Sequence, residues 1–485
     1  MSSSPHLPDT PTMADLWHRA VADRGSSAFC DVIGGPTVTY TEADAWVAQL
    51  RSELATRGVE RGDRVALQAE KSLSAVVLYL ACITSGIVLL PLNTSYTEAE
   101  TEPMLADAGA RLVVRDGDDL LSNSAQSPTG RSGSVVSVGP DEVATLLYTS
   151  GTTGTPKGAP LTQHNLAANA LTLKDAWGFT RDDVLVHVLP TYHAHGLFVA
   201  INTVIASGCS MRFADRFDPA LTSTLLDGAT VLMAVPTHYT RLLAHDGFTR
   251  EACRTMRLFI SGSAPLTPQA HAEFFERTGH VILERYGMTE TVMLTSNPLD
   301  GERRAGTVGP PLPGVSVRVC DDDDRIVEAG ETGAVQVRGP SVFGGYWQRP
   351  ELNATEFTPE GWFRTGDLGR FDTDGYLTLV GRSKDLVITG GLNVYPIEVE
   401  RVLDDLDDVT ESAVIGCPDA DFGERVVAVV VPRAGALVDP AAVRDAARDR
   451  LAGFKVPKVV YLVDELPRNA MGKVDKKALR ARFCQ

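Results

Sequence analysis

Short apolar runs recur along the chain, most of them separated by helical segments, and this alternation constrains the fold more than any other feature. The runs include RLVVRD, VATLLYTS, DVLVHVLP, ATVLMAVP and MRLFISGS, and helix-like segments such as QHNLAANALTLKDAW lie between several of them. Buried strands that alternate with helices pair in parallel, with the helices on the faces of the sheet. The pattern therefore predicts a layered α/β architecture.

Two N-terminal windows sharpen this prediction. Residues 41–57 carry apolar side chains at helical spacing, and the strand-like run DRVALQAE follows them. The most apolar window, residues 75–93, is interrupted by Thr84, Ser85 and Gly86 before it would span a bilayer. We expect a buried helix followed by a short strand in this window.

The chain, at 485 residues, is too long for one ordinary hydrophobic core. We predict a large N-terminal domain over residues 1–383, built of layered α/β subdomains and a β-rich subdomain whose hairpin-like pattern begins after Gly306. Residues 384–485 are predicted to form a small α+β domain. The segment 120–140, rich in Ser, Gly and Pro, is typical of a solvated loop.

Composition and charge exclude several classes of protein. Apolar residues at 44% and charged residues at 22% argue against wholesale disorder, and a net charge of −17 opposes binding to nucleic acid or anionic membranes. Seven cysteines without a CxxC pair cannot all pair within the chain, which predicts a reducing compartment and no zinc site. The N-terminus has no basic segment followed by an apolar one, so we expect a cytoplasmic protein.

The loop YTSGTTGTPKG, residues 148–158, has the chemistry of a polyphosphate site. Glycines let backbone N–H groups approach a phosphate closely, and the hydroxyls and one lysine add donors and positive charge. The P-loop pattern is not matched, because Pro156 and Gly158 stand where that motif needs Gly and Ser or Thr. The alternative is a flexible surface turn, which is what most loops rich in Gly, Ser and Thr are.

Further motifs identify the loop as part of a known pattern. The loop resembles the phosphate-loop signature of the adenylate-forming superfamily, and ERYGMTE, GWFRTGD, GRSKDLVITGGLNVYPIEVE and PRNAMGK resemble further signatures in the family's order. The resemblance implies an acyl-CoA synthetase, luciferase or peptide-synthetase adenylation domain. In that reaction a carboxylic acid is joined to AMP with loss of pyrophosphate, and the acyl group then passes to a thiol, as in coenzyme A.

The resemblance assigns roles to residues that match the family motifs. It places over the β- and γ-phosphates of ATP the residues Thr149, Ser150, Gly151, Thr152, Thr153, Gly154 and Lys157. It places around the adenine and ribose the residues Ser261, Gly262, Ser263, Ala264, Glu284, Tyr286, Gly287, Met288, Asp367 and Arg382. Thr289 would contact the α-phosphate, and Glu290 would help to hold Mg²⁺, which counters the charge developed when two anions meet.

The C-terminal motifs imply a moving domain. Lys473 resembles the lysine that the family delivers to the forming acyl phosphate, and Lys384 would be the hinge about which the C-terminal domain rotates. Gly390 and Gly391 would let the pantetheine arm of coenzyme A pass close to the backbone. The pair Lys455 and Lys458 either meets the phosphates of coenzyme A or is merely solvated.

Two arginines outside the nucleotide-binding assignments indicate which acid the protein would use. LPTYHAHGLF, VPTHYTRLL, LFISGSAPL and LERYGMTETVMLTSNP resemble parts of malonyl-CoA synthetases, in which two arginines hold the distal carboxylate. The matching residues here are Arg241 and Arg285, with His193 shaping the acyl pocket. Guanidinium groups bind carboxylates bidentately, so this pair would favour a dicarboxylic acid.

Alternatives remain open at this point. His193 and His195 are compatible with core histidines or a weak metal pair, and the small Ala194, with Met293, would leave room for the methyl group of methylmalonate. Other candidate functions are a synthetase for oxalate or a short monocarboxylic acid, and an adenylation enzyme that loads a carrier protein. Downstream acyl-transferring enzymes would be the partners.

Overall fold

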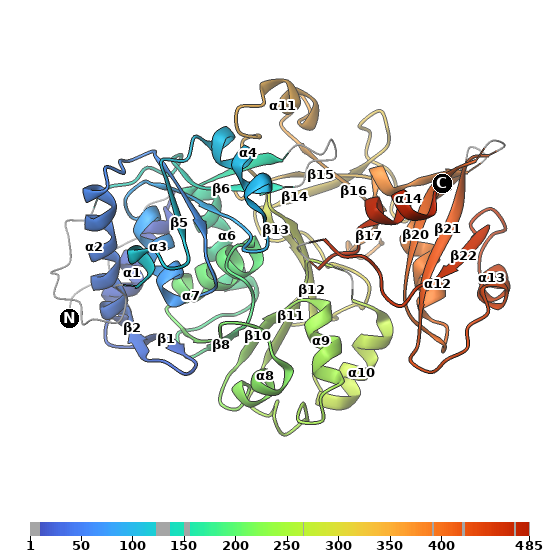
Figure 1. Ribbon diagram of the computed structural model, residues 1–485, viewed down its shortest axis with the longest axis horizontal. Helices are drawn as coiled ribbons and strands as arrows, with labels where there is room; N and C mark the ends of the chain where they lie inside the picture. Colours follow the sequence, from blue (N-terminus) through green and yellow to red (C-terminus); the bar gives the residue numbers. More distant parts are fainter. Residues whose placement is uncertain are drawn as a thin grey trace. The chain divides into compact units, whose positions relative to one another are not determined.

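The computed structural model describes residues 10–122, 136–149, 156–264, 266–389, 392–419, 422–469 and 472–484. The chain divides into two compact units (Figure 1). The first comprises residues 1–317 and 337–363, and the second comprises residues 318–336 and 364–485. This division differs from the boundary predicted after residue 383, which stays a prediction about the part that moves.

The first unit contains an eight-stranded sheet that is parallel at its centre. Its strand order is β13-β12-β11-β10-β8-β9-β1-β2, and only the edge strands β13 and β2 are antiparallel to their neighbours. The strands are β1 (Ala28–Val32), β2 (Thr37–Thr39), β8 (Val184–His187), β9 (Ser210–Phe213), β10 (Val231–Ala234), β11 (Leu258–Ser261), β12 (Leu283–Met288) and β13 (Val292–Ser296). The predicted parallel α/β arrangement is therefore present.

A second, five-stranded sheet has the order β5-β3-β4-β6-β7. Its strands are β3 (Arg64–Gln68), β4 (Val88–Pro91), β5 (Leu112–Arg115), β6 (Val143–Thr149) and β7 (Lys157–Thr162). All neighbours are parallel except β6 and β7, which pair antiparallel with Thr149 opposite Lys157. The two ends of the predicted phosphate loop are thereby fixed side by side.

The helices of the first unit begin where the sequence supplies caps. The predicted helix over residues 41–57 spans Tyr40–Thr56, because Thr39 and Glu42 form a capping box. The predicted buried helix is α3, all of whose residues are buried against β4, β6, α1 and α2. The helices are α1 (Met13–Arg24), α2 (Tyr40–Thr56), α3 (Leu73–Ile83), α4 (Glu98–Ala108), α5 (Asp119–Ser122), α6 (Gln163–Ala176), α7 (Asn202–Ser207), α8 (Pro219–Leu225), α9 (Pro236–Leu243), α10 (Pro268–Thr278), α11 (Pro350–Glu356) and the π-helix η2 (His195–Ile201).

A third sheet follows the hairpin-like part of the sequence. Its order is β14-β15-β16-β17, with β14 (Ser316–Cys320), β15 (Gly333–Arg338), β16 (Phe363–Phe371) and β17 (Leu377–Arg382). The short 3₁₀-helix η3 (Ser383–Asp385) comes directly after β17. Within the described ranges, no helix combines the length and apolar character needed to cross a membrane.

The last sheet packs helices on both of its faces. Its order is β19-β18-β21-β20 with β22 beside β21, and its members are β18 (Val387–Thr389), β19 (Leu392–Val394), β20 (Val409–Asp419), β21 (Gly423–Pro432) and β22 (Val459–Leu462). Alternate valines of β21 enter two cores, one shared with α12 (Pro396–Asp404) and α13 (Pro440–Arg448) and the other with α14 (Lys476–Phe483). Burial on both faces explains why β21 is apolar without alternation.

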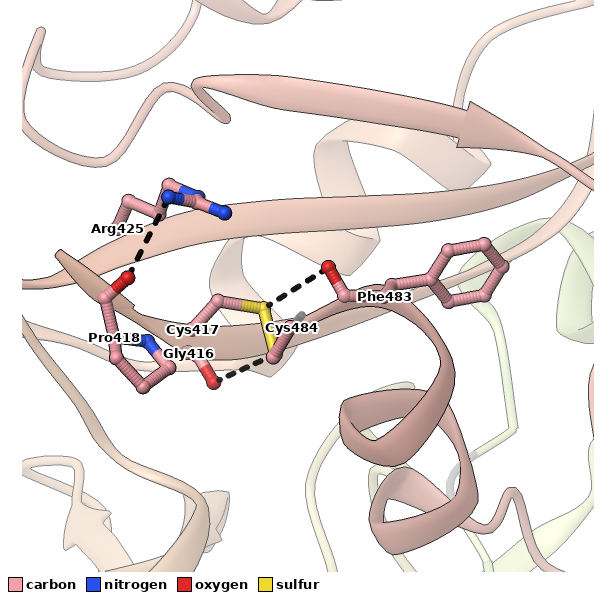
Figure 2. Close-up of a disulfide and its surroundings, with 6 residues drawn as sticks. All are labelled: Gly416, Cys417, Pro418, Arg425, Phe483 and Cys484. Atoms are coloured by element: carbon pink, nitrogen blue, oxygen red, sulfur yellow. Dashed lines mark hydrogen bonds between the residues drawn. A yellow bond between two sulfur atoms is a disulfide. The ribbon is translucent and has the colours of Figure 1, made fainter.

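Cysteine pairing departs from the expectation drawn from the sequence. Cys417 on β20 and Cys484 just after α14 form a disulfide, with 4.9 Å between their Cα atoms (Figure 2). The partners lie 67 residues apart, so no spacing motif reveals the pair. The free cysteines among the described residues are all buried, at positions 30, 82, 209, 253 and 320.

We expect the disulfide to stabilise the second unit. Replacing Cys484 by Ser should lower the free energy of unfolding of this unit by about 2–4 kcal/mol, because the closed loop restricts the unfolded chain. Calorimetry of the full chain with and without dithiothreitol measures the effect, and the reductant should not shift the variant further. A wild-type transition indifferent to the reductant would contradict the expectation.

Candidate active site

Neighbouring parallel strands of the large sheet bring the predicted residues to one edge (Figure 1). Strand β8 leads into the loop with His193 and His195, β10 leads into α9 with Arg241, β11 ends at Ser261, and β12 ends directly before Thr289. Carboxyl ends of parallel strands meet at the same edge, which is where open α/β sheets bind ligands.

The loop after β8 is held in one conformation by its backbone. His187 donates from Nε2 to the carbonyl of Gly196 at 2.9 Å, which ties the two ends of the loop together. A Cβ atom on Gly196 would lie 2.0 Å from the carbonyl oxygen of Pro190, so only glycine fits there. The π-helix η2 starts at the end of this loop and packs against β13. His193 and Ala194 are thereby presented, half-buried, at the site.

Arg285 is a buried cation at the end of β11. Ser261 pairs with Glu284, so Arg285 lies just beyond the end of β11, and a Cβ atom on Gly262 would be 2.4 Å from its guanidinium carbon. The side chain is buried, and its Nε and Nη2 have no hydrogen-bond partner among the described residues. Burial lowers the pKa of Arg285 to about 9, so the group remains charged at neutral pH. A buried charge with unpaired donors calls for an anion.

His195 stands beside this cation in its neutral form. Its ring is buried, with Nδ1 3.5 Å from the hydroxyl of Ser263, and burial together with the charge of Arg285 holds its pKa well below the usual value. His193 instead lies half-buried against the ring of Tyr192. No cluster of metal-ligating side chains occurs in the described part of the chain, and the neighbouring cation further disfavours a metal pair at these histidines.

Arg241 has a different environment from Arg285. It lies in the last turn of α9 and is exposed. After burial, the charge of Arg241 is a further cause of the lowered pKa of His238. His238 is in turn one of the residues that lower the pKa of His195. The two arginines therefore belong to one electrostatic neighbourhood. That both arginines bind the distal carboxylate of the substrate stays a prediction.

The phosphate-loop residues can be placed only at the loop's ends. Thr149 and Lys157 face each other across the β6–β7 pair, whereas Ser150, Gly151, Thr152, Thr153 and Gly154 lie outside the described residues. Lys157 Nζ lies 3.7 Å from a carboxylate oxygen of Glu356 and 5.1 Å from the ring centre of Tyr346. Sequence reasoning missed both partners, although GGYW, which contains Tyr346, is an unusual run of turn and aromatic residues.

Glu290 is a buried carboxylate at the turn after β12. The hydroxyl of Tyr346 donates to Oε1 of Glu290 at 2.8 Å, and the backbone carbonyl of Glu290 accepts from Phe343 N–H at 2.9 Å. A single carboxylate suits Mg²⁺, which takes most of its remaining ligands from substrate phosphates and water. Glu290 thus fits the metal that the family resemblance implies.

The residues predicted around adenine include one with another role. Glu284 is buried, and its carboxylate accepts from Leu266 N–H at 3.3 Å and Gly306 N–H at 3.2 Å and pairs with His271 at 2.8 Å. These contacts tie together the segments that surround the site. They make Glu284 a structural anchor and leave its side chain little capacity for ATP.

Most of the other residues predicted around the adenine and the acyl group are closely packed. Ser261 and Tyr286 are buried, and Ser263 adopts a φ of 72°, which turns the chain at the segment before Ala264. A Cβ atom on Gly287 would lie 2.5 Å from the methyl group of Met293, so Met293 rests on the backbone next to Met288.

The second unit holds the predicted ribose and hinge residues. Asp367 and Arg382 are paired across β16 and β17, and their side chains form an ion pair at 3.0 Å. Asp367 is buried and its carboxylate is thus oriented by Arg382. Lys384 follows in η3, and the next residue, Asp385, accepts from Arg480 on α14 at 2.9 Å.

Lys473 is carried by a tight turn in this unit. Asn469 binds its backbone on both sides, with Lys473 N–H donating to the Asn469 side chain at 3.1 Å and Asn469 N–H donating to the Lys473 carbonyl at 2.8 Å. Gly472 supplies the positive φ of 74° that closes the turn. The backbone of the lysine is therefore fixed in place.

The predicted contacts with coenzyme A are only partly placed. Gly390 and Gly391 lie outside the described residues. Lys455 is bound to Glu398 at 2.6 Å, whereas Lys458 is exposed near the ring of Phe422, and a role of either lysine toward coenzyme A stays a prediction.

Comparison with protein families defines the class of this protein. A model of the AMP-binding enzyme family matches residues 16–347, and one of the AMP-binding enzyme C-terminal domain matches residues 398–473. The chain belongs to the AMP-binding enzyme family. The predicted membership of the adenylate-forming superfamily is thereby confirmed.

Individual relatives align over most of the chain. The malonate–CoA ligase of Arabidopsis thaliana is 34% identical over 481 residues, covering 87% of this chain and 80% of that protein. The mitochondrial malonate–CoA ligase of Mus musculus is 37% identical, covering 98% and 92%, and the oxalate–CoA ligase of Arabidopsis thaliana is 34% identical, covering 98% and 99%. The solved structure of ATP-bound MatB from Rhodopseudomonas palustris is 47% identical with a TM-score of 0.93, covering 97% and 99%.

The neutral histidines of the site should make the fold sensitive to acid. Burial and the charges of Arg241 and Lys71 lower the pKa of His238 to about 4, whereas in the unfolded chain it is about 6.5. Below pH 6.5 the unfolded state binds a proton at His238 that the folded state does not. The free energy of unfolding therefore decreases by about 1 kcal/mol for each unit by which the pH is lowered between pH 6 and 5.

His238→Gln should remove this contribution. Urea unfolding between pH 6 and 5 gives the free energy of unfolding as a function of pH. The slope for the variant should correspond to uptake of about one proton fewer on unfolding than in the wild type. The denaturant dependence should stay unchanged as a control. Parallel curves for the two proteins would rule out a neutral His238 in the folded state.

Proposed function

We propose that this protein is an AMP-forming malonate–CoA ligase, which converts ATP, malonate and coenzyme A into malonyl-CoA, AMP and diphosphate. Malonate–CoA ligases are among the relatives that align over most of the chain. The observation that carries the choice of malonate is Arg285, whose buried donors have no acceptor among the described residues. A second carboxylate on the substrate supplies the missing anion.

The reaction has two steps. One carboxylate oxygen of malonate attacks the α-phosphorus of ATP, the bond to the β-phosphate oxygen breaks, and diphosphate leaves with the electron pair. The thiol of coenzyme A, on losing its proton, then attacks the acyl carbon of malonyl-AMP, and AMP leaves. Mg²⁺, when bound, neutralises charge on the phosphates.

The residues of the first unit serve the first step. Lys157 and the loop that precedes it bind the β- and γ-phosphates, Thr289 contacts the α-phosphate, and Glu290 holds the metal. Arg285, with Arg241 at the same edge of the sheet, binds the distal carboxylate. Because the cation is buried beside a neutral histidine, a monocarboxylic acid would leave it unpaired, which costs more than the loss of one contact.

The second unit supplies residues for both steps. Asp367, oriented by Arg382, accepts from the ribose hydroxyls, and Lys473 donates to the oxygen between the acyl group and the phosphate. Rotation about Lys384 withdraws Lys473 after adenylation and brings Gly390 and Gly391 to the pantetheine arm.

Oxalate is a second candidate substrate, because an oxalate–CoA ligase aligns with 98% of the chain. Oxalate is shorter than malonate by one carbon, so the same cation would have to reach further. A carrier-protein thiol in place of coenzyme A is the remaining alternative. We further infer a cytoplasmic location and delivery of the product to acyl-transferring enzymes.

A panel of acids tests the proposal. Release of diphosphate and the mass of the thioester should show malonate as the preferred substrate, with methylmalonate accepted because Ala194 is small, and acetate and oxalate used poorly. Arg285→Lys should lower kcat/KM for malonate about 100-fold, since lysine cannot replace a bidentate guanidinium. Equal use of acetate and malonate by the wild type would refute the assignment, and thioester formed only on a carrier protein would replace coenzyme A as the acceptor.

Lys473 has a separate test. Lys473→Ala should abolish most formation of malonyl-AMP while the affinity for ATP, measured by calorimetry, stays within about twofold, because the lysine acts on the transition state. Lys477→Ala, which changes an exposed lysine on α14, is the matched control. Adenylation at the wild-type rate in the Lys473 variant would overturn its role.

A further inference from the structure

The segment from Tyr346 to Glu356 contacts two charged residues of the proposed triphosphate site, Lys157 and Glu290. This segment is not part of the family motifs described above. Tyr346 lies between Glu290, to which its hydroxyl donates at 2.8 Å, and Lys157, whose ammonium lies 5.1 Å from its ring centre. Lys157 is also 3.7 Å from Glu356, and its side chain is only 13% exposed. All of these residues belong to the first unit.

The backbone of Tyr346 is held in place by hydrogen bonds to the side chain of Asn353. Its N–H donates to the Asn353 side-chain oxygen at 2.7 Å, and its carbonyl accepts from the Asn353 amide at 3.1 Å. Gly345 has a φ of 129°, and a Cβ atom there would lie 2.7 Å from Asn353, so the turn closes around this side chain. The next residue, Trp347, donates from its N–H to Gly158 on β7 at 2.8 Å.

The hydrogen bond from Tyr346 acts on one oxygen of Glu290. A carboxylate whose Oε1 accepts a fixed hydrogen bond cannot rotate freely, so this bond sets the orientation of the whole group. Partners behind a metal ligand commonly set its affinity in this way. The hydroxyl is well placed to do so, because Tyr346 and Glu290 are both buried.

Glu356 acts on Lys157. Without nucleotide, the carboxylate of Glu356 balances the charge of this partly buried lysine. Phosphate oxygens of ATP need the same ammonium group, so the carboxylate and the triphosphate compete for it. A carboxylate close to the site also repels the incoming phosphates.

We propose that the segment from Tyr346 to Glu356 sets the two charged groups of the triphosphate site, Tyr346 as the positioning residue of Glu290 and Glu356 as a placeholder anion that ATP displaces from Lys157. The inference rests on the roles proposed above for Glu290 and Lys157. It is independent of which acid the enzyme uses.

Calorimetric titration of the full-length protein with ATP, without acid or coenzyme A, separates the two roles. At saturating Mg²⁺, Glu356→Gln should tighten ATP binding about fivefold, since it removes a competing and repelling charge. Glu351→Gln is the matched control: Glu351 lies on the same helix, is exposed, and gives the same change in net charge. ATP affinity that is weaker than or equal to the control's would overturn the placeholder role.

Tyr346→Phe should instead raise the Mg²⁺ concentration required for half-maximal ATP binding about tenfold, with little change at saturating Mg²⁺. The free energy of unfolding, measured alongside, separates this from general loosening of the fold. A variant that loses ATP affinity equally at every Mg²⁺ concentration, or keeps the wild-type Mg²⁺ dependence, would overturn the positioning role. Failure of malonate in the acid panel would leave both results standing, because neither titration contains an acid.

Discussion

Parallel pairing of β8, β10, β11 and β12 determines where the polar groups of the first unit lie. Strands β8, β10 and β11 are short and almost wholly apolar, whereas β12 itself carries Glu284 and Arg285, and each strand ends in a segment that carries a charged or hydroxyl side chain. Because parallel neighbours present the same end to the same edge, residues separated by nearly a hundred positions become neighbours. A change in register at β11 would move Ser261 away from Glu284 and displace Gly262 from beneath Arg285.

The resulting edge holds unusual electrostatics. Burial lowers the pKa values of both Arg285 and Lys71, and these basic groups lie near histidines whose own pKa values are lowered by burial and by the basic groups. Such an arrangement is costly for an isolated protein and becomes favourable when an anion enters. The proposed selectivity for a diacid would follow from the buried Arg285, whose Nε and Nη2 have no acceptor among the described residues, and the fold must be stable enough elsewhere to tolerate this charge.

Many helices and strands of the fold could be predicted from the sequence, because local patterns determine local structure. The helix predicted over residues 41–57 differs from α2 by one residue at each end, and β6 lies within the predicted run VATLLYTS. What sequence could not give depends on packing between distant segments. The ion pair of Lys157 with Glu356, the structural role of Glu284 and the pairing of Cys417 with Cys484 all join residues whose proximity no spacing rule encodes. The grouping of residues 318–336 with the second unit is of the same kind, since it follows from strand pairing across β15 and β16.

The bond between Cys417 and Cys484 makes a covalent ring of the chain from β20 to its penultimate residue, and the turn that bears Lys473 lies inside that ring. A protease that nicked an exposed loop between these cysteines would therefore open the ring without detaching either piece. The lysine would stay tethered to its sheet, and the break would become visible as two fragments only on a gel run with reductant.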